Sequence, residues 1–313
     1  MLLELDLAGA DWMVVANVSG DKNMMSVAHS GKSPHVITGK LMSGMTEEVI
    51  EQEDALLKKV KDIDDIAAIR RDKIPIVFSG NWLPRTWSIR QAAKKANHGG
   101  NYREGVRMFS MFNEMDESEA KKLLERYTCQ SIAHGKHGHT CGQVAYPGIR
   151  EWWEKTDKQI RETRTLQNCF GRKIYFTQQM GEDLFKAAYS FIPQSTVFDI
   201  TAMGMRKFMD DGSEDFAPSQ LRAQVHDSLL FDYLSQDFGA MARFVFGQVK
   251  YMSPTIHYTE DFVLRVTLKG GFIWRDLKDI EIGNNITELA DRLEEHWKKC
   301  RETQEIKPSA QAA

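Results

Sequence analysis

Four polar side chains recur every four residues in the stretch "RQAAKKANHGGNY". If this segment is helical, Arg90, Lys94, His98 and Tyr102 share one face, because residues four apart lie above one another on an α-helix. Two cations and an imidazole on a single face suit the binding of phosphate groups. A solvated basic surface is the commoner fate of such a stripe, and the pattern alone leaves both interpretations open.

The same stretch carries two adjacent glycines, Gly99 and Gly100. Each glycine costs a helix interior about 1 kcal/mol relative to alanine. The sequence therefore predicts a helix that is broken or loosened in its third turn, beside the polar stripe.

Two aspartates, Asp6 and Asp227, fall where strands are expected to end or turn. Asp6 closes the alternating stretch "LLELDL". Asp227 lies at the centre of residues 221–234, whose aliphatic runs on both sides of "HDS" predict a strand–turn–strand hairpin. Carboxylates that a sheet brings together from distant positions are ligands of the kind that Mg²⁺ prefers. Each aspartate by itself is more often a cap or a solvated turn residue, so the pair is a hypothesis at this point.

The composition is that of a globular protein. Of its residues, 42% are apolar and 27% are charged. The length of 313 residues is enough for one large domain or two ordinary ones. The net charge is −3, yet residues 85–107 hold six Lys and Arg against one Glu. A local basic face on a nearly neutral chain favours a phosphate site over a surface that is basic throughout.

The cysteines and the N-terminal segment bear on the compartment. Four cysteines are widely spaced and include no C-x-x-C pair, which indicates a reducing compartment. No apolar run of the sequence approaches the roughly 20 residues that span a bilayer. The first residues carry acids and no basic region, unlike a signal peptide. We therefore expect a cytoplasmic protein without a membrane partner.

Strands are expected at both ends of the chain and helices between them. Residues 46–71 have helical periodicity with a charged outer face, and residues 182–210 predict a long helix interrupted at Pro193. Asp116 followed by Glu119 has the pattern of a capping box at a helix start. This order of elements predicts an α+β fold rather than a doubly wound sheet.

Taken in order, these motifs resemble the polymerase domain of family A DNA polymerases, the polymerase I-like group. The stretch "LDLAGADWMVVANVSGD" is similar to the family's first motif, "RQAAKKANHGGNY" to its fingers motif and "QVHDSLLF" to its third motif. Further segments that resemble the family are "PHVITGKLM", "YPGIREWWEKT", "PQSTVFD" and "GGFIW". The resemblance covers nearly the whole chain. It implies a right-hand polymerase fold, with a palm of antiparallel sheet and helices, helical fingers and no thumb.

The resemblance also implies domain boundaries. We expect palm at residues 1–32 and 165–313 and fingers at 33–164, with an insertion at 128–145 and a disordered tail from about 306. Because the family's thumb precedes its first motif, we expect a fragment or one part of a split polymerase. A separate polypeptide would then supply the thumb and an exonuclease.

The implied activity is that of a DNA-directed DNA polymerase, a nucleotidyltransferase that adds dNTPs to a primer 3′-hydroxyl. Asp6, Asp227 and the backbone carbonyl of Leu7 would hold two Mg²⁺ ions, one activating the primer hydroxyl and one neutralising the triphosphate. Arg90 and Lys94 would grip the phosphates, and Lys94 would also protonate the leaving pyrophosphate. The expected partners are primer–template DNA and dNTPs.

Other positions take their expected roles from the resemblance alone. Beside Arg90 and Lys94, the expected nucleotide-binding residues are His35, His98, Tyr102, Asp11 and Gly9. The expected DNA-binding residues are Gln194, Gln224, His226, Tyr102, Arg103 and Arg164.

Some positions depart from the family's pattern and keep alternatives open. Asp11 stands where the family has a glutamate that excludes a ribose 2′-hydroxyl, and Ser228 replaces the acid after the catalytic aspartate, as in single-subunit RNA polymerases. A related nucleotidyl transferase with relaxed sugar selectivity is therefore one alternative. A non-catalytic remnant that binds DNA or a partner is another. The short, divergent motifs favour a phage-type enzyme.

The expected insertion is rich in histidine and cysteine. Cys129, His134, His137, His139 and Cys141 have the side chains of a zinc site, but their spacing matches no standard ligand pattern. We favour a solvated loop that touches the template and keep zinc as the alternative.

Overall fold

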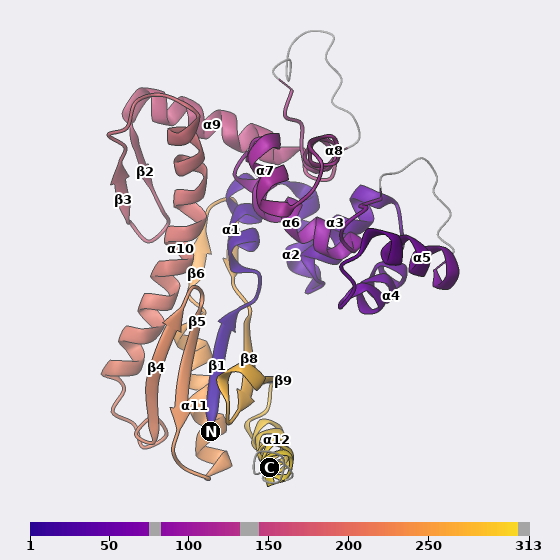
Figure 1. Cartoon of the computed structure of the whole chain (residues 1–313). Coiled ribbons are helices and arrows are strands. Elements are labelled where there is room, and N and C mark those ends of the chain that lie inside the picture. The colour runs from indigo at the N-terminus through magenta and orange to yellow at the C-terminus, as the bar shows by residue number, and fades with distance from the viewer. Residues whose placement is uncertain (75–82, 132–143, 306–313) are drawn as a thin grey trace, which may run out of the picture. The chain divides into compact units, whose positions relative to one another are not determined.

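The computed structural model describes residues 1–74, 83–131 and 144–305 (Figure 1). Helices and an antiparallel sheet make up the described part, which confirms the predicted α+β class. None of the helices in these three ranges is both long enough and apolar enough to cross a bilayer.

The chain divides into two compact units. Unit 1 comprises Met1–Ala10, Ser195–His257 and Asp261–Ala313, and unit 2 comprises Asp11–Gln194 and Tyr258–Glu260. The predicted palm and fingers differ from these units in their boundaries. The assignment of the units to palm and fingers stays a prediction.

Unit 1 is built on a sheet. Its strands are β1 (Leu2–Leu7), β4 (Ser219–Val225), β5 (Ser228–Tyr233), β6 (Thr255–His257), β7 (Asp261–Val263), β8 (Val266–Gly271) and β9 (Lys278–Ile280). Its helices are α11 (Phe238–Tyr251), the 3₁₀ turn η1 (Trp274–Asp276) and α12 (Ile286–Glu305). The helix α10 spans Glu182–Asp210, and its second half also belongs to unit 1.

Five of these strands form one antiparallel sheet in the order β4-β5-β1-β8-β9, so β1 lies at its centre (Figure 1). Side chains alternate along β1. Leu3, Leu5 and Leu7 are fully buried, whereas Glu4 and Asp6 lie on the opposite, partly exposed face. The apolar face of β1 therefore anchors the strand in the core, and the other face is left for polar groups.

Aromatic side chains fill the core of unit 1 on the apolar side of the sheet. Phe244 of α11 lies 5.2 Å from Phe231 of β5 and 4.9 Å from Phe216, measured between ring centroids. Phe208 of α10 lies 5.0 Å from Phe231. These edge-on and tilted contacts hold α10 and α11 against the strands.

Unit 2 is mainly helical. Its helices are α1 (Ala10–Ser19), α2 (Lys22–Ser30), α3 (Pro34–Ser43), α4 (Glu47–Leu57), α5 (Ile63–Lys73), α6 (Ile89–Asn101), α7 (Val106–Asn113), α8 (Glu117–Tyr127), α9 (Gly148–Thr163) and the first half of α10. A two-stranded hairpin, β2 (Thr165–Gln167) and β3 (Lys173–Tyr175), follows α9.

The core of unit 2 is also aromatic. Tyr127, Tyr146 and Trp153 are fully buried, and Tyr146 lies 5.1 Å from Tyr127 and 5.8 Å from Trp12 between ring centroids. Tyr127 is the last residue of α8, Tyr146 precedes α9, and Trp153 and Trp12 lie within α9 and α1. They bring together helices that are far apart in the sequence.

The helical periodicity predicted for residues 46–71 is confirmed, and the stretch forms two helices. The side chain of Asp62 accepts hydrogen bonds from the amides of Asp64 and Asp65 and so starts the second of them, α5. The predicted interruption at Pro193 was wrong, since α10 runs through this residue. Burial of neighbouring side chains such as Thr196 stabilises the helix enough to tolerate the missing amide donor.

The capping-box prediction is half correct. α8 begins directly after Asp116, but the Asp116 side chain makes no capping hydrogen bond. The carboxylate of Glu119 accepts from the backbone amide of Arg85 at 2.9 Å instead. A tertiary partner has taken the place of the local one.

The expected break at Gly99 and Gly100 does not occur, since α6 continues to Asn101. A Cβ at Gly99 would lie 2.6 Å from the ring of Phe109, and one at Gly100 would lie 2.2 Å from the ring of Tyr127. The two glycines therefore allow two aromatic rings to touch the helix backbone. Their role is close packing rather than loosening.

We predict that Gly100→Ala destabilises the chain. The overlap with Tyr127 should outweigh the gain in helix propensity of about 1 kcal/mol and lower the free energy of unfolding by about 1–3 kcal/mol. Urea denaturation measures the change. Gly181→Ala is the control, because its added Cβ meets no atom within 4 Å. Equal effects of the two substitutions would contradict this explanation of the glycines.

Candidate active site

The register of the central strands brings Asp6 and Asp227 together within unit 1. β1 pairs with β5 so that Asp6 lies opposite Ser228, the residue after Asp227. The amide of Leu7 donates to the carbonyl of Asp227 at 3.2 Å. The two carboxyl groups are close enough to share a hydrogen bond. The predicted hairpin and the predicted end of the first strand therefore meet at one point of the sheet.

The hairpin turn has an unusual backbone that fixes Asp227. His226 has φ of 53°, in the left-handed region that few residues other than glycine adopt. The side chain of Gln224 donates to the carbonyl of His226 at 2.6 Å, and the Ser228 hydroxyl donates to the carbonyl of Val225 at 3.0 Å. Gln224 and His226 are exposed on this turn. The side chain of Ser228 is buried and serves the turn itself.

The electrostatics of the pair are those of two crowded carboxylates. Burial, and then the charge of Asp227, raise the pKa of Asp6 from its ordinary value of 3.8 to about 6. The ammonium of Lys269 on β8 opposes this shift. A divalent cation bound between the two groups would relieve their repulsion.

The donor set suits a hard cation. Two carboxylates and the adjacent backbone at Leu7 offer oxygen ligands, which Mg²⁺ and similar ions prefer. Across residues 1–74, 83–131 and 144–305, no three or more His, Cys, Asp or Glu side chains cluster so that they could hold a metal ion. Further ligands of an ion at Asp6 and Asp227 would therefore be backbone, water or phosphate oxygens.

The sequence analysis missed two charged residues near the Asp6–Asp227 pair, Lys269 and Glu4. Lys269 lies opposite Glu4 in the register and forms an ion pair with it at 2.9 Å. The indole N–H of Trp274 donates to the other Glu4 oxygen at 2.8 Å. The available signal was the period of two along β1, which puts Glu4 on the same face as Asp6.

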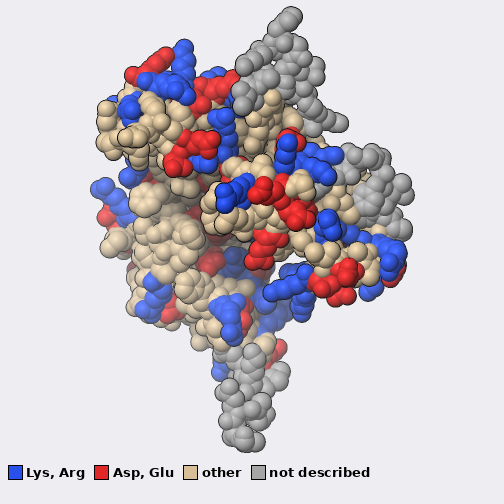
Figure 2. Space-filling view, turned by 45° about the horizontal axis from the view of Figure 1, so that its top comes forward, with Lys and Arg blue, Asp and Glu red and all other residues tan. Residues whose placement is uncertain are grey.

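The basic stripe of unit 2 lies on α6, as the spacing predicts. Lys94 and His98 are exposed and line a groove of about 710 Å³ together with Gln91, Lys95 and Tyr102. Elsewhere positive and negative side chains are interspersed, as the face in Figure 2 shows. Neither this face of the molecule nor the net charge of the chain indicates a surface that is basic throughout.

His35 lies beside the two cations of the stripe. Burial, and then the charges of Arg90 and Lys94, lower the pKa of His35 to about 4. The imidazole is therefore neutral near pH 7. Unit 2 thus brings together three residues that the resemblance implies as nucleotide-binding residues.

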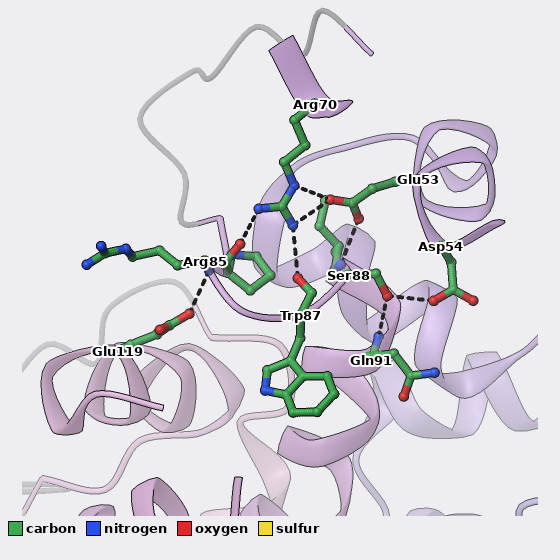
Figure 3. Close-up of polar contacts among 10 residues, drawn as sticks. Glu53, Asp54, Arg70, Arg85, Trp87, Ser88, Gln91 and Glu119 are labelled. Atoms are coloured by element: carbon green, nitrogen blue, oxygen red, sulfur yellow. Dashed lines mark hydrogen bonds and ion pairs between the residues drawn. The ribbon is translucent and has the colours of Figure 1, made fainter. Parts of the chain in front are cut away.

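The start of α6 is anchored by a buried ion pair (Figure 3). Glu53 of α4 is fully buried, forms an ion pair with Arg70 of α5 at 2.6 Å, and accepts from the amide of Ile89 at 2.7 Å. The Arg70 guanidinium also donates to the backbone carbonyls of Pro84 and Trp87. One carboxylate and one guanidinium thus fix the segment that leads into the stripe.

A second carboxylate of α4 holds Arg90 itself. Asp54 accepts from the Ser88 hydroxyl at 2.5 Å and lies 3.3 Å from the Arg90 guanidinium. Ser88 in turn caps α6 by accepting from the Gln91 amide (Figure 3). Arg90 is therefore oriented by Asp54 of α4, a contact for which the sequence offered no signal.

The end of the stripe is tied to α1. The Tyr102 hydroxyl donates to a carboxylate oxygen of Asp11, and burial raises the pKa of Tyr102 well above its usual range. The His98 ring lies 6.1 Å from the Tyr102 ring in an edge-on arrangement. Gly9 lies between β1 and α1 with φ of 59°, which gives a backbone reason for glycine there.

The remaining predicted DNA-binding residues have structural partners of their own, except Gln194, which is exposed on α10. The Arg103 guanidinium donates to the Tyr189 hydroxyl at 3.3 Å and pairs with Asp157 at 3.6 Å. Arg164 donates to the backbone carbonyls of residues 176 and 178 at 3.3 and 2.5 Å. Their contacts with DNA stay predictions.

The candidate zinc set cannot be assembled from the described part of the chain. Cys129 is buried and lies two residues after the end of α8. His134, His137, His139 and Cys141 lie outside the described residues, as does the predicted tail from about 306. The resemblance also implies that α6 faces the carboxylate pair; this concerns both units and stays a prediction.

Comparison with known proteins points to one family. The family model of DNA polymerase family A matches residues 52–276, which is most of the chain. The chain belongs to DNA polymerase family A. Enzymes of this family generally depend on divalent metal ions.

Individual relatives share the family's sequence at low identity. The thermostable DNA polymerase I of Thermus aquaticus is 23% identical over 249 residues, covering 78% of this chain and 24% of that protein. The same enzyme of Thermus filiformis is 22% identical over 284 residues, covering 89% and 27%. The chain thus spans about a quarter of the length of the curated relatives that it matches.

A solved structure has the same fold. It is the POL domain of Pol1 from M. smegmatis in complex with DNA primer-template and dNTP, with a TM-score of 0.58 and 16% identity. The match covers 85% of this chain and 38% of that one. It supports the predicted palm-and-fingers class of fold.

We predict that Asp6→Asn stabilises the chain at pH 8 without divalent ions. The pKa of Asp6 is about 6 in the folded chain against 3.8 ordinarily, so ionisation above pH 6 costs stability. After solvent screening we expect a gain of about 1–2 kcal/mol at pH 8. The gain should shrink as pH falls through 6 and vanish below about 4.

Urea denaturation across this pH range measures the effect. Asp291→Asn, at an exposed position of α12, is the matched control and should change little at any pH. A gain that does not depend on pH would show that Asp6 is not repelled as described.

We further predict that Arg70→Met costs about 3–5 kcal/mol of unfolding free energy, because Glu53 would remain buried without a partner. Arg71→Met is the control, since Arg71 is 74% exposed and forms a surface ion pair with Asp72. Its substitution should cost less than about 0.5 kcal/mol. Thermal denaturation of both variants compares them, and similar melting temperatures would refute the anchoring role.

Proposed function

We propose that this chain carries the catalytic core for template-directed DNA synthesis, in which dNTPs are added to a primer 3′-hydroxyl. The observation that carries the proposal is the pairing of Asp6 with Asp227 at the centre of the sheet. Membership of DNA polymerase family A supports it. So does the fold of a POL domain described in complex with primer-template and dNTP.

Magnesium is the cation we propose for the pair. Asp6, Asp227 and the carbonyl of Leu7 would hold it, and bound Mg²⁺ would activate the primer hydroxyl and neutralise phosphate charge. The chain's part is to keep the two carboxylates adjacent and ionised in a fixed geometry. The sheet register and the bonded turn at His226 serve that purpose.

The nucleotide's phosphates are proposed to bind at the stripe of α6. Arg90, Lys94 and His35 lie close together in unit 2 and offer two charges and a neutral donor. Lys94 is exposed, as a general acid that protonates pyrophosphate must be. Asp54 orients Arg90 and must yield to phosphate or share the guanidinium with it.

Sugar selectivity is proposed to depend on Asp11. Its carboxylate accepts from Tyr102, which would hold it in one orientation at the start of α1. Asp11 is one methylene shorter than the glutamate of the family's pattern, so discrimination against rNTPs is expected to be weaker than in a glutamate-bearing enzyme.

Primer extension tests the function. The full chain with Mg²⁺, a primer–template and dNTPs should extend the primer, alone or mixed with the polypeptide encoded upstream. Asp227→Asn should lower the rate by on the order of 10³-fold or more, and Lys94→Ala by about 10²–10⁴-fold. Asp291→Asn should leave the rate unchanged.

The outcomes separate the alternatives. A clear preference for rNTPs would contradict DNA synthesis in favour of a related nucleotidyl transferase. No incorporation in either arrangement, with intact binding of the primer–template, would favour a DNA-binding remnant.

A further inference from the structure

A buried polar cluster in unit 2 has no role in the chemistry proposed so far. Its centre is Asn97 of α6, which is 2% exposed. The side chains of Trp12, Thr38 and Tyr146, all buried, connect to it or to each other by hydrogen bonds. Asn97 follows Lys94 by three residues, so it lies on the same side of α6 as the cations.

The orientation of the Asn97 amide follows from its partners. The indole nitrogen of Trp12 lies 3.2 Å from Oδ1 of Asn97, and an indole N–H can only donate. The atom that faces Trp12 must therefore be the oxygen. The single proton of the Thr38 hydroxyl can go to this oxygen at 2.9 Å or to the Pro34 carbonyl at 2.7 Å, so the assignment rests on Trp12. The amide NH₂ of Asn97 must then point to the other side.

On that other side lies His35. Nδ2 of Asn97 is 2.9 Å from Nδ1 of His35. Because the amide nitrogen can only donate, Nδ1 must accept and carries no proton. A neutral imidazole in this contact has its proton on Nε2. Among the residues that the structure describes, none accepts a hydrogen bond from that nitrogen.

The charges around His35 favour the neutral ring. Arg90 and Lys94 of α6 are the charged groups that act on it, and together with burial they disfavour a third positive charge. A neutral ring keeps its Nε2–H as a donor without titrating near pH 7.

We propose that Asn97 is a positioning residue: it fixes His35 as the Nε2–H tautomer, which then donates a hydrogen bond to the phosphates of an incoming nucleotide. The identity of this ligand rests on the proposed function, whereas the tautomer follows from the contacts of Trp12, Asn97 and His35. The two cations supply charge, and His35 supplies a directed bond. Nucleotide binding by this donor is then independent of pH between about 6 and 8.5, since the ring stays neutral.

Asn97→Asp is the decisive variant. An aspartate keeps one oxygen for Trp12 and Thr38, but it replaces the amide donor by an oxygen that accepts. Nδ1 of His35 should then become protonated. Asn101→Asp is the matched control, since Asn101 lies one turn later on α6, is also 2% exposed, and bonds to Tyr127 rather than His35.

Two measurements follow the change. ¹⁵N NMR of the full chain should show Nδ1 of His35 unprotonated in the wild type and in Asn101→Asp, and protonated in Asn97→Asp. In primer extension, the KM for dATP should stay flat from pH 6 to 8.5 in the wild type. In Asn97→Asp it should rise about tenfold with pH, as the imidazolium loses its Nε2 proton. Adding His35→Gln should remove that pH dependence.

The result that overturns the inference is a wild-type His35 with its proton on Nδ1, or identical profiles of KM against pH for the two asparagine variants. The wild-type spectrum decides even if Asn97→Asp fails to fold. The expected tautomer in a wild-type chain that extends no primer counts instead against the proposed function, so the two failures are distinguishable.

Discussion

Two carboxylates held side by side by a sheet are the constraint on which the candidate site depends. Antiparallel pairing sets Asp6 opposite Ser228, and the left-handed backbone of His226 lets a two-residue turn deliver Asp227 to the same point. The repulsion of the pair appears as the raised pKa of Asp6. Burial of Leu3, Leu5 and Leu7 on the other face of β1 offsets that cost and keeps the strand in register. The proposed cation site on one face of β1 is thus paired with a buried apolar face on the other.

The two sides of helix α6 differ in their side chains and in their contacts. Its outer face carries Lys94 and His98 along a groove. Its inner face consists of small residues and two glycines against which Phe109 and Tyr127 pack. The start of the helix is fixed by Glu53 and Arg70, and its middle by Asn97. Each of these contacts removes a degree of freedom from the residues that would bind phosphate, which is how a rigid scaffold orients a polar site.

Much of this could be predicted from local patterns. The alternation along β1 and the aliphatic runs around "HDS" predicted the strand and the hairpin, because a period of two and a polar turn are encoded by neighbouring residues. The polar stripe predicted α6 for the same reason. The break at Gly99 and Gly100 was wrong, because propensity counts the cost of glycine to the helix and not the rings that need the space. The helical periodicity of residues 46–71 was confirmed, but it did not show that Asp62 accepts from nearby amides and divides the stretch into two helices.

The sequence by itself determined the family motifs, the class of fold and the residue types of the site. Only the tertiary structure decided which partners those residues have. Lys269 meets Glu4 through the pairing of β8 with β1, and Asp54 meets Arg90 although 36 positions separate them. Nothing in the pattern around Asn97 predicts that Trp12 orients its amide or that His35 receives it. Such contacts depend on how distant elements pack, and packing is decided by the shape and burial of whole helices and strands rather than by the spacing within any one of them.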